Sequence, residues 1–402
     1  MTKIRASLVT IAALFVPASA VAQPASEPAG PPPPPAAAPT SGPKIVPLGY
    51  VETHFSWNFN RPANGITNYR GFDNRHATFT LDNVALGANA EAGPVAARLI
   101  LQVGATPSTY YAGEPSLAGS SGANATSGEL WKFVQEANFS LHATSALTVQ
   151  GGLFPSPIGY EVLAVKDNWN WSRSNLFFAL PYYHAGVRVT YELTAEIAWT
   201  AGVYNGWNDI VDGNEGKTVM THLTYKVPDK VLVQALYCGG PERPTGAPEG
   251  PWFRHHFDLF GQIDVTSFLA FVAQLDYGFE PDRIGTARWW GGALYVRAKP
   301  VDRLYVALRG DFFHEDLATD SAGDRSSTPL FFNGVEWVSS PTATLDFRPH
   351  ERISLRLEGR HDMAASPLYF GHDVKGTGAP ADPYVPDRRT QTTLLAGATA
   401  WF

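Results

Sequence analysis

The sequence predicts an all-β fold, a closed antiparallel transmembrane β-barrel of sixteen strands, with fourteen to eighteen as the accepted range. Apolar and polar residues alternate with a period of two along much of the chain, as in strands with one apolar face. The connections between these segments are short and long in turn. The final segment, 389–402, stops on Phe402 without a tail. A strand in that position needs a partner at each edge, which a closed barrel provides.

The first residues of the chain predict export. Lys3 and Arg5 precede an apolar run of about ten residues, whereas a membrane-spanning helix needs about 20. Small residues at Ala20 and Ala22 offer cleavage sites. We therefore predict a secretory signal peptide over residues 1–22.

A Pro- and Ala-rich segment, 23–45, follows and includes the proline run 31–35. This composition favours polyproline II structure and buries little apolar surface. We predict a flexible periplasmic leader; a tether to a periplasmic partner or to the cell wall is the alternative. Residues 46–402 are assigned to the barrel.

Composition argues against several other classes of protein. No stretch approaches the roughly 20 consecutive apolar residues of a transmembrane helix. Cys238 is the only cysteine, so an intrachain disulfide is impossible. The formal net charge of -7 at pH 7 is too small to favour a nucleic-acid partner.

Period-two segments bounded by turn residues predict the individual strands. In chain order these are 46–59, 74–91, 94–105, 131–143, 146–154, 183–193, 195–205, 217–228, 230–239, 254–265, 268–279, 288–299, 302–314, 334–347, 351–362 and 389–402. In 351–362, Ile353, Leu355 and Leu357 share one face and charged residues share the other. In a membrane barrel the apolar face contacts lipid and the charged face lines a wet lumen.

The connections alternate in length along the whole chain. The tight ones are 92–93, 144–145, 194, 229, 266–267, 300–301 and 348–350. The long ones, rich in Gly, Pro, Asn and Asp, are 60–73, 106–130, 155–182, 206–216, 240–253, 280–287, 315–333 and 363–388. Short periplasmic turns and long external loops are typical of bacterial outer-membrane barrels. The even strand number places both mature termini on the periplasmic side.

The third long connection, 155–182, is predicted to fold into the lumen. Sixteen strands enclose a space too wide for wall side chains to fill, so it holds water. This connection contains two tryptophans and the charged residues Glu161, Lys166, Asp167 and Arg173. Its aromatic rings would pack on the inner wall and leave its charges at a constriction. A cap over the rim or a contact between subunits is the alternative.

The strands also place charged side chains toward the lumen by parity. The predicted pore-lining set contains the four charged residues of the third connection and Arg188, Arg297, Arg309, Arg352, Arg356, Glu358 and Arg360. Charged rings or ladders set ion preference by their sign. Arg352, Arg356 and Arg360 form a basic ladder, which favours a weak anion preference. A wall of mutually paired charges without selectivity is the alternative.

The region from 151 to 218 resembles a known family. The segments that carry the resemblance are Gly152-Leu-Phe-Pro-Ser-Pro-Ile-Gly-Tyr-Glu161, 168–174, Pro181-Tyr-Tyr-His-Ala-Gly-Val-Arg188 and Asn205-Gly-Trp-Asn208. They look like the OmpL-like β-barrel porins, the porin-2 family, and the resemblance extends over most of the mature chain. It implies an outer-membrane pore with no defined substrate and supplies no catalytic residues.

No catalytic, metal or cofactor site is predicted. The acidic loop 209–215 could offer oxygen ligands to Ca²⁺, but its spacing lacks the Gly and Glu of an EF-hand loop. His255 and His256 are adjacent on a strand and point to opposite faces. Ser354 and His350 lie near each other without a nucleophile-elbow motif, so an enzyme is not expected.

Together these observations predict an outer-membrane porin, a water-filled channel for passive diffusion of small hydrophilic solutes and ions. Its partners would be outer-membrane lipid and those solutes. The alternative is a plugged structural or adhesion barrel that binds a partner through its loops or its Pro-rich leader. Family analogy suggests a homotrimer. The outward residues Ala396, Ala398 and Ala400 of the last strand are small, so an oligomer interface is expected there first.

Overall fold

The computed structural model describes residues 42–117, 125–283, 285–316, 322 and 330–402. The predicted signal peptide, 1–22, and most of the predicted leader, 23–45, lie outside the described residues. Among the residues that are described, no helix is long and apolar enough to cross a membrane.

The strands of the described chain form one antiparallel sheet. Their bounds are β1 Lys44–Asn58, β2 Thr78–Ala92, β3 Val95–Val103, β4 Val134–His142, β5 Leu147–Pro155, β6 Tyr183–Glu192, β7 Ile197–Tyr204, β8 Thr218–Val227, β9 Val231–Pro241, β10 Phe253–Thr266, β11 Leu269–Pro281, β12 Thr286–Val301, β13 Leu304–Asp316, β14 Trp337–Ser339, β15 Thr342–His350, β16 Ile353–Ala364 and β17 Thr390–Trp401. Short helical segments in the connections are α1 Thr106–Tyr110, α2 Gly128–Trp131, η2 Val165–Asp167 and η3 Leu176–Ala179. Each predicted strand has an observed counterpart with ends within a few residues.

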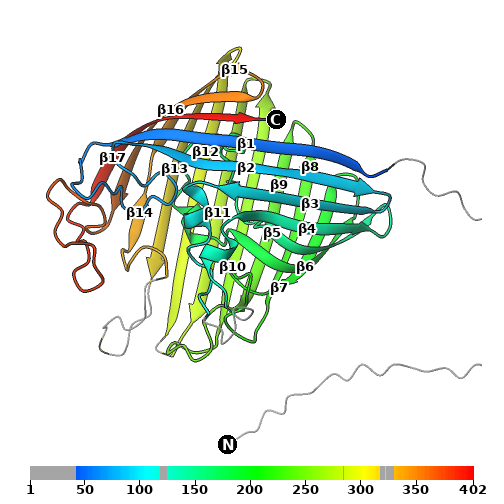
Figure 1. Ribbon diagram of the computed structural model, residues 1–402, viewed down its shortest axis with the longest axis horizontal. Helices are drawn as coiled ribbons and strands as arrows, with labels where there is room; N and C mark the ends of the chain where they lie inside the picture. The colour runs from blue at the N-terminus through cyan, green and yellow to red at the C-terminus, as the bar shows by residue number, and fades with distance from the viewer. Residues whose placement is uncertain (1–41, 118–124, 284, 317–321, 323–329) are drawn as a thin grey trace, which may run out of the picture. The chain divides into compact units, whose positions relative to one another are not determined.

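The sheet closes between the first and last strands (Figure 1). Val51 of β1 lies opposite Val84 of β2 on one side and Ala400 of β17 on the other. The backbones of Gly49 and Phe402 exchange hydrogen bonds, with N···O distances of 3.4 and 3.0 Å. The last residue is therefore paired, and the predicted closed barrel is confirmed.

One predicted strand, 334–347, is interrupted. β14 and β15 lie end to end between β13 and β16, and each pairs with both neighbours. The break falls at Ser340 and Pro341, where proline has no backbone N–H to donate to the ladder. The seventeen strands thus occupy sixteen places around the wall, as the sequence predicted.

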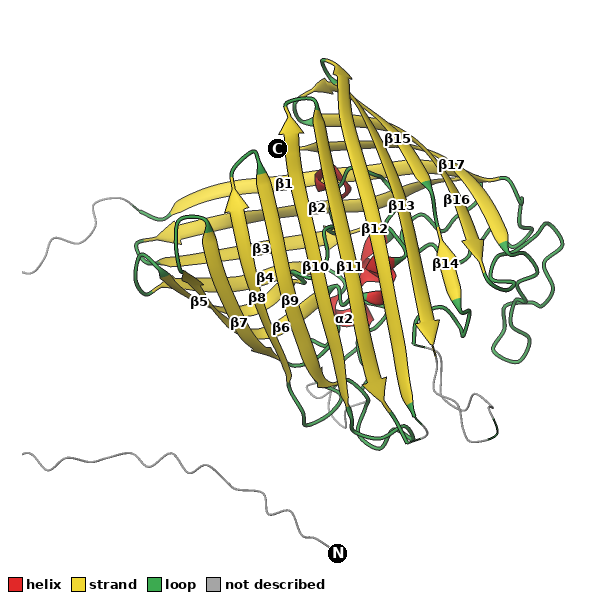
Figure 2. Ribbon diagram, turned by 180° about the vertical axis from the view of Figure 1, so that it is seen from behind, coloured by secondary structure: helices red, strands yellow, loops and turns green. Residues whose placement is uncertain are grey.

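Short and long connections lie at opposite ends of the barrel (Figure 2). Tight turns join β2 to β3, β8 to β9 and β12 to β13, and the positive φ of Gly93, Asp229 and Arg303 reverses the chain in these turns. The turns between β4 and β5, β6 and β7, β10 and β11, and β15 and β16 are short as well. The connections at the other end of the barrel are longer, although the one between β11 and β12 contains only 282–285. We refer below to the short-turn end and the long-loop end.

The outward face of the wall is apolar and the inward face is polar. Leu275 and Leu294 point outward and are 60% and 66% exposed. Inward positions such as Gln274 and Arg309 are buried at 2% exposed. This inverts the arrangement of a water-soluble sheet, and it is the pattern of a barrel whose outer face contacts lipid.

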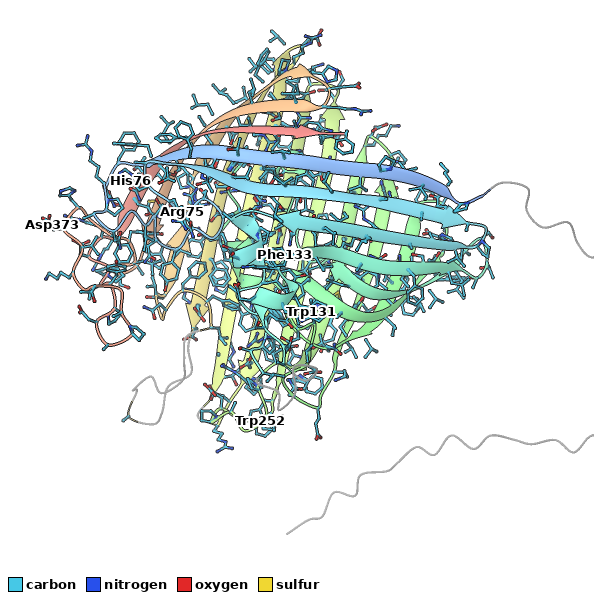
Figure 3. All side chains as sticks on the ribbon, in the orientation of Figure 1. Arg75, His76, Trp131, Phe133, Trp252 and Asp373 are labelled. Atoms are coloured by element: carbon cyan, nitrogen blue, oxygen red, sulfur yellow. The ribbon has the colours of Figure 1, made fainter. Side chains whose placement is uncertain are left out.

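Aromatic residues lie next to the first residues of two strands at the long-loop end. Phe133 and Trp252, each 50% exposed, directly precede β4 and β10 (Figure 3). Amphipathic rings prefer the boundary between lipid and water. Their position fits an aromatic belt at this boundary.

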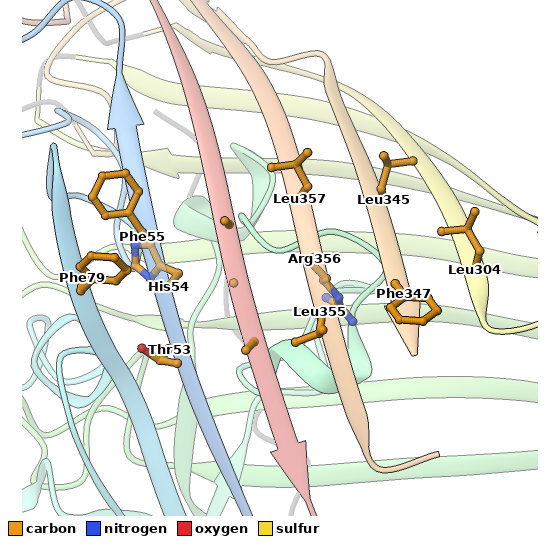
Figure 4. A pocket seen from close by; sticks show the side chains of 13 residues that line it. Thr53, His54, Phe55, Phe79, Leu304, Leu345, Phe347, Leu355, Arg356 and Leu357 are labelled. Atoms are coloured by element: carbon orange, nitrogen blue, oxygen red, sulfur yellow. The ribbon is translucent and has the colours of Figure 1, made fainter. Parts of the chain in front are cut away.

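The outward face of β17 is hollowed. Ala396, Gly397 and Ala398 contribute to an apolar depression of about 560 Å³, with Phe55 and Leu357 among its flanking residues (Figure 4). The small side chains of the last strand therefore leave a shallow groove in the outer wall, which agrees with the thin face expected from the sequence.

Candidate functional site: the lumen and the loop that enters it

The connection between β5 and β6, residues 156–182, lies inside the barrel. Its backbone contacts inward side chains on three distant strands: Val165 N donates to Glu52 Oε1 (2.6 Å), Tyr160 N to Gln274 Oε1 (3.0 Å) and Trp171 N to Glu358 Oε2 (2.5 Å). Figure 2 shows short helical segments enclosed by the strands. The predicted inward fold of the third loop is confirmed.

Glu358 of β16 fixes the middle of this loop. Its carboxylate accepts the backbone N–H groups of Trp171 and Ser172, at 2.5 and 2.9 Å, and the hydroxyl of Thr344 at 2.7 Å. The residue is 1% exposed. A buried carboxylate needs such donors, because burying an uncompensated charge is costly.

An ion pair links the start of the loop to β13. Arg309 Nη1 lies 2.9 Å from Glu161 Oε1, and Arg309 Nε lies 3.2 Å from Asp311 Oδ2. Arg309 Nη1 also donates to the carbonyl of Ser172 at 2.5 Å. The other oxygen of Glu161 accepts the N–H and the hydroxyl of Ser174, at 2.7 and 2.6 Å. These bonds attach two parts of the loop to one point on the wall.

The two buried arginines of the predicted basic ladder also hold the loop. Arg356 Nη1 donates to the carbonyls of Val165 and Asn170, at 3.0 and 3.2 Å. Arg360 donates to the carbonyl of Arg173 and pairs with Asp362 at 2.5 Å. Both arginines face inward, as parity predicted, but each is only 2% exposed.

Arg173 stabilises the loop from within. Its guanidinium donates to the carbonyls of Val162, Leu163 and Trp171. It also lies over the rings of Phe72 and Phe177, 5.3 and 5.8 Å from their centroids. The side chain therefore organises the fold of the loop and is 3% exposed.

The predicted pore-lining residues thus fall into two groups. Six are buried between the loop and the wall: Glu161, Arg173, Arg309, Arg356, Glu358 and Arg360. Five remain partly open to solvent: Lys166, Asp167, Arg188, Arg297 and Arg352. Any influence of either group on ion preference stays a prediction.

The accessible group is spread around the lumen. Lys166 and Asp167 pair with each other at 2.7 Å in η2, and Arg352 lies at the short-turn end, 3.7 Å from Glu351. Arg188 donates to Gln150 at 2.8 Å. It lines a polar hollow of about 230 Å³ that also includes Arg98, Glu136 and Asn138.

Sequence reasoning missed several residues that hold the loops in the lumen. Asn175 at the start of η3 donates to Asp311 and to Ser340, at 2.6 and 2.8 Å, beside the break between β14 and β15. Arg70 of the first long connection pairs with Asp362 at 3.2 Å. The sequence offered no spacing signal for these contacts, because they join segments far apart in the chain.

Gly397 of β17 gives a further prediction. A Cβ at this position would overlap the ring of Trp171, so only glycine permits the loop to pack against β17 here. We expect Gly397→Val to displace Trp171 and to make the loop sensitive to limited proteolysis. Gly359→Val on β16 is the matched control, because no atom of the described part of the chain lies within 4 Å of its Cβ position. Equal protease resistance of both variants would contradict the prediction.

A buried acidic cluster lies at the long-loop end. Asp209 is 8% exposed, and burial raises its pKa to about 8, with the negative charges of Glu242 and Glu114 adding to the effect. Both neighbours accept backbone N–H groups, Glu242 from Trp207 at 2.7 Å and Glu114 from Ile210 at 3.0 Å. The cluster is therefore compatible with a protonated Asp209.

The raised pKa predicts a pH-dependent loop. The folded-state pKa exceeds the ordinary aspartate value of about 4. The protonated carboxyl of Asp209 therefore stabilises the closed loop, and this stabilisation is fully present below pH ~4. It is lost as pH rises through about 8. We expect the opening constant of 205–217, measured by amide hydrogen exchange corrected for intrinsic rates, to rise at least about tenfold from pH 5 to pH 8. Asp209→Asn should weaken this dependence without removing it, because burial also raises the pKa values of Glu114 and Glu242. A pH profile of that variant equal to the wild-type profile would contradict the assignment.

Comparison with known proteins identifies similar sequences and folds. Residues 45–402 match the family model described as "Putative beta-barrel porin-2, OmpL-like". No curated protein sequence matches the chain at a significant level.

Several solved structures share the fold. OmpT of Vibrio cholerae, an outer membrane protein in a trimer form, is 10% identical, and the match covers 90% of this chain and 100% of that one with a TM-score of 0.57. The outer membrane channel DcaP of Acinetobacter baumannii is 11% identical, with coverage of 90% and 99% and a TM-score of 0.56. The anion-selective porin from Comamonas acidovorans is 12% identical, with coverage of 90% and 100% and a TM-score of 0.55. At these identities the likeness concerns the fold alone.

Proposed function

The chain belongs to the OmpL-like β-barrel porin-2 family, and on this premise we propose that it forms a water-filled channel for passive diffusion of small hydrophilic solutes and ions across the bacterial outer membrane. The observation that carries the proposal is the inverted wall, apolar outside and charged inside. Such a wall suits lipid on one side and water or polar groups on the other. Diffusion requires no chemical step, so the proposal assigns no catalytic residue and no cofactor.

The proposal includes an orientation. β1 starts and β17 ends at the short-turn end, where Lys44 lies opposite Glu91 near the turn between β2 and β3. We place this end in the periplasm and the long loops outside the cell. A signal peptide over 1–22 and a periplasmic leader over 23–45 complete this arrangement.

The inward loop, 156–182, is proposed as the constriction that sets the size of permitted solutes. Its buried contacts with Glu358, Arg309 and Arg356 support a fixed position. On this view the six buried charges position the loop, while Lys166, Asp167, Arg188, Arg297 and Arg352 contact the solute path.

Planar lipid bilayers test the proposal. Purified protein should produce stable, stepwise openings, and the reversal potential in a salt gradient should report the ion preference. Absence of openings from folded barrel would instead support a plugged structural or adhesion barrel, an alternative that the tightly packed loop also suits.

A homotrimer is also part of the proposal. The hollow along Ala396, Gly397 and Ala398 is the surface where a second copy would fit first. Chemical crosslinking in outer-membrane fragments tests the subunit number, and a product no larger than one chain would contradict the trimer.

A further inference from the structure

Arg297 differs from the other inward arginines of β12, β13, β15 and β16. Arg309, Arg348, Arg356 and Arg360 each lie within 3.5 Å of a carboxylate oxygen. Among the described residues, Arg297 has no such ion pair and no hydrogen-bond acceptor on its guanidinium. It is half-buried on the lumen side of β12. A charged group in this state is left to interact with water or with a solute.

Aromatic rings hold the guanidinium in place. Its Cζ lies 4.6 Å from the ring centroid of Trp169 in the inward loop and 5.5 Å from that of Tyr305 on β13. Cation–π contacts of this kind orient the group without neutralising its charge. The nearby acid, Asp264, accepts a hydrogen bond from Gln262 at 2.9 Å. The N–H edge of Arg297 is therefore preorganised, and no acceptor among the described residues occupies it.

Further charged residues lie beyond Arg297, toward the short-turn end. Arg348 lies over the other ring partner, Tyr305, at 4.9 Å. Tyr305 and Arg348 in turn line a polar hollow of about 570 Å³, shared with Lys299 and Arg303, between the turns that follow β12 and β15. Asp302 and Glu351 also line this hollow, whereas no carboxylate of the described residues forms an ion pair with Arg297.

We propose that Arg297 is the docking point for the oxyanion group, a carboxylate or a phosphate, of solutes that pass the inward loop. This rests on the proposed channel function and adds the solute class to it. A guanidinium binds such groups through two parallel N–H···O bonds, and its planar fork cannot be replaced by an ammonium group. Trp169 and Tyr305 would act as positioning residues for the fork.

The test compares wild type with Arg297→Gln, Arg297→Lys and Arg288→Gln in planar bilayers. Arg288 is the matched control, since it is on the same strand but exposed on the outward face near the long-loop end. Inorganic phosphate and acetate are added separately as blockers of chloride current, which distinguishes the two oxyanion sources. Arg297→Gln should shift the reversal potential toward cations and raise the half-blocking concentration of at least one oxyanion about tenfold. Arg297→Lys should keep the reversal potential of wild type but lose the block.

Either of two outcomes in the blocking experiment decides against the proposal. Equal block of wild type and Arg297→Gln, or full block retained by Arg297→Lys, would show that no bidentate site exists. Calorimetric titration of the detergent-solubilised barrel with phosphate and acetate, in wild type and Arg297→Gln, measures the site without conduction. A wild type that binds an oxyanion but never conducts would refute the channel function and support the oxyanion site. A wild type that conducts but binds no oxyanion would support the channel function and refute the site.

Discussion

Replacement of residues 163–178 by a short Gly-Ser linker should raise the unit conductance of the channel several-fold. The segment contains Trp169, Trp171 and most of η3, which are buried inside the barrel. Their removal widens the open cross-section, while the strands keep their own backbone pairing. Single-channel recording in a planar bilayer measures the effect.

A second consequence concerns the residues behind the loop. Arg356 and Arg360 lose their carbonyl partners in the loop and become exposed to the lumen, while Glu358 loses two backbone donors. Glu52 and Asp311 lose donors in the same segment, so the deletion exposes charges of both signs. The reversal potential of the shortened channel should therefore differ from that of wild type, because groups that were buried then line the lumen. Arg356 and Arg360 of the predicted basic ladder would contact the solute path only in this variant.

Deletion of 373–386 in the last long connection is the control of similar length. That segment contacts the inward loop through none of the hydrogen bonds described above, so conductance should stay at the wild-type value. Unchanged conductance after loss of 163–178 would show that the loop is not the constriction.

The wall of the barrel was predictable because its signals are local. Each strand needs an apolar outer face and a polar inner face, so apolar and polar residues alternate along every strand segment. The direction of Arg356 and Arg360 follows from the same parity. The groups that bind these two arginines do not follow from parity. Their partners are loop carbonyls at 165–173, and no local sequence pattern connects these positions to β16.

Two features of the site have weaker signals in the sequence. Pro341 inside a predicted strand indicates an interruption, and the structure has one beside Asn175. Gly397 in the last strand indicates a close approach of another group, which is Trp171. A proline or a glycine within a predicted strand can have several structural causes. Neither signal therefore identified the residue that lies next to it in the structure.

Arg309→Met should destabilise the folded barrel by about 3–5 kcal/mol, because it leaves Glu161 and Asp311 buried without their cation. Guanidinium-induced unfolding in lipid vesicles measures the loss. Glu161→Gln should cost less, since Arg309 keeps Asp311 at 3.2 Å and the carbonyl of Ser172. Arg352→Met is the exposed control, with its ion partner 3.7 Å away, and should change the free energy of unfolding by at most about 1 kcal/mol.

The same variants separate a structural role for Arg309 from a direct role in conduction. If the arginine only fixes the loop, Arg309→Met should increase conductance together with protease sensitivity of 156–182, because the freed loop no longer holds one position. If its charge attracted ions directly, the reversal potential would shift while the loop stayed protected. Burial at 2% exposed favours the first outcome, since a group shielded from water contacts no passing ion. A stable Arg309→Met barrel with wild-type unfolding would show that the pair with Glu161 contributes nothing to holding the loop.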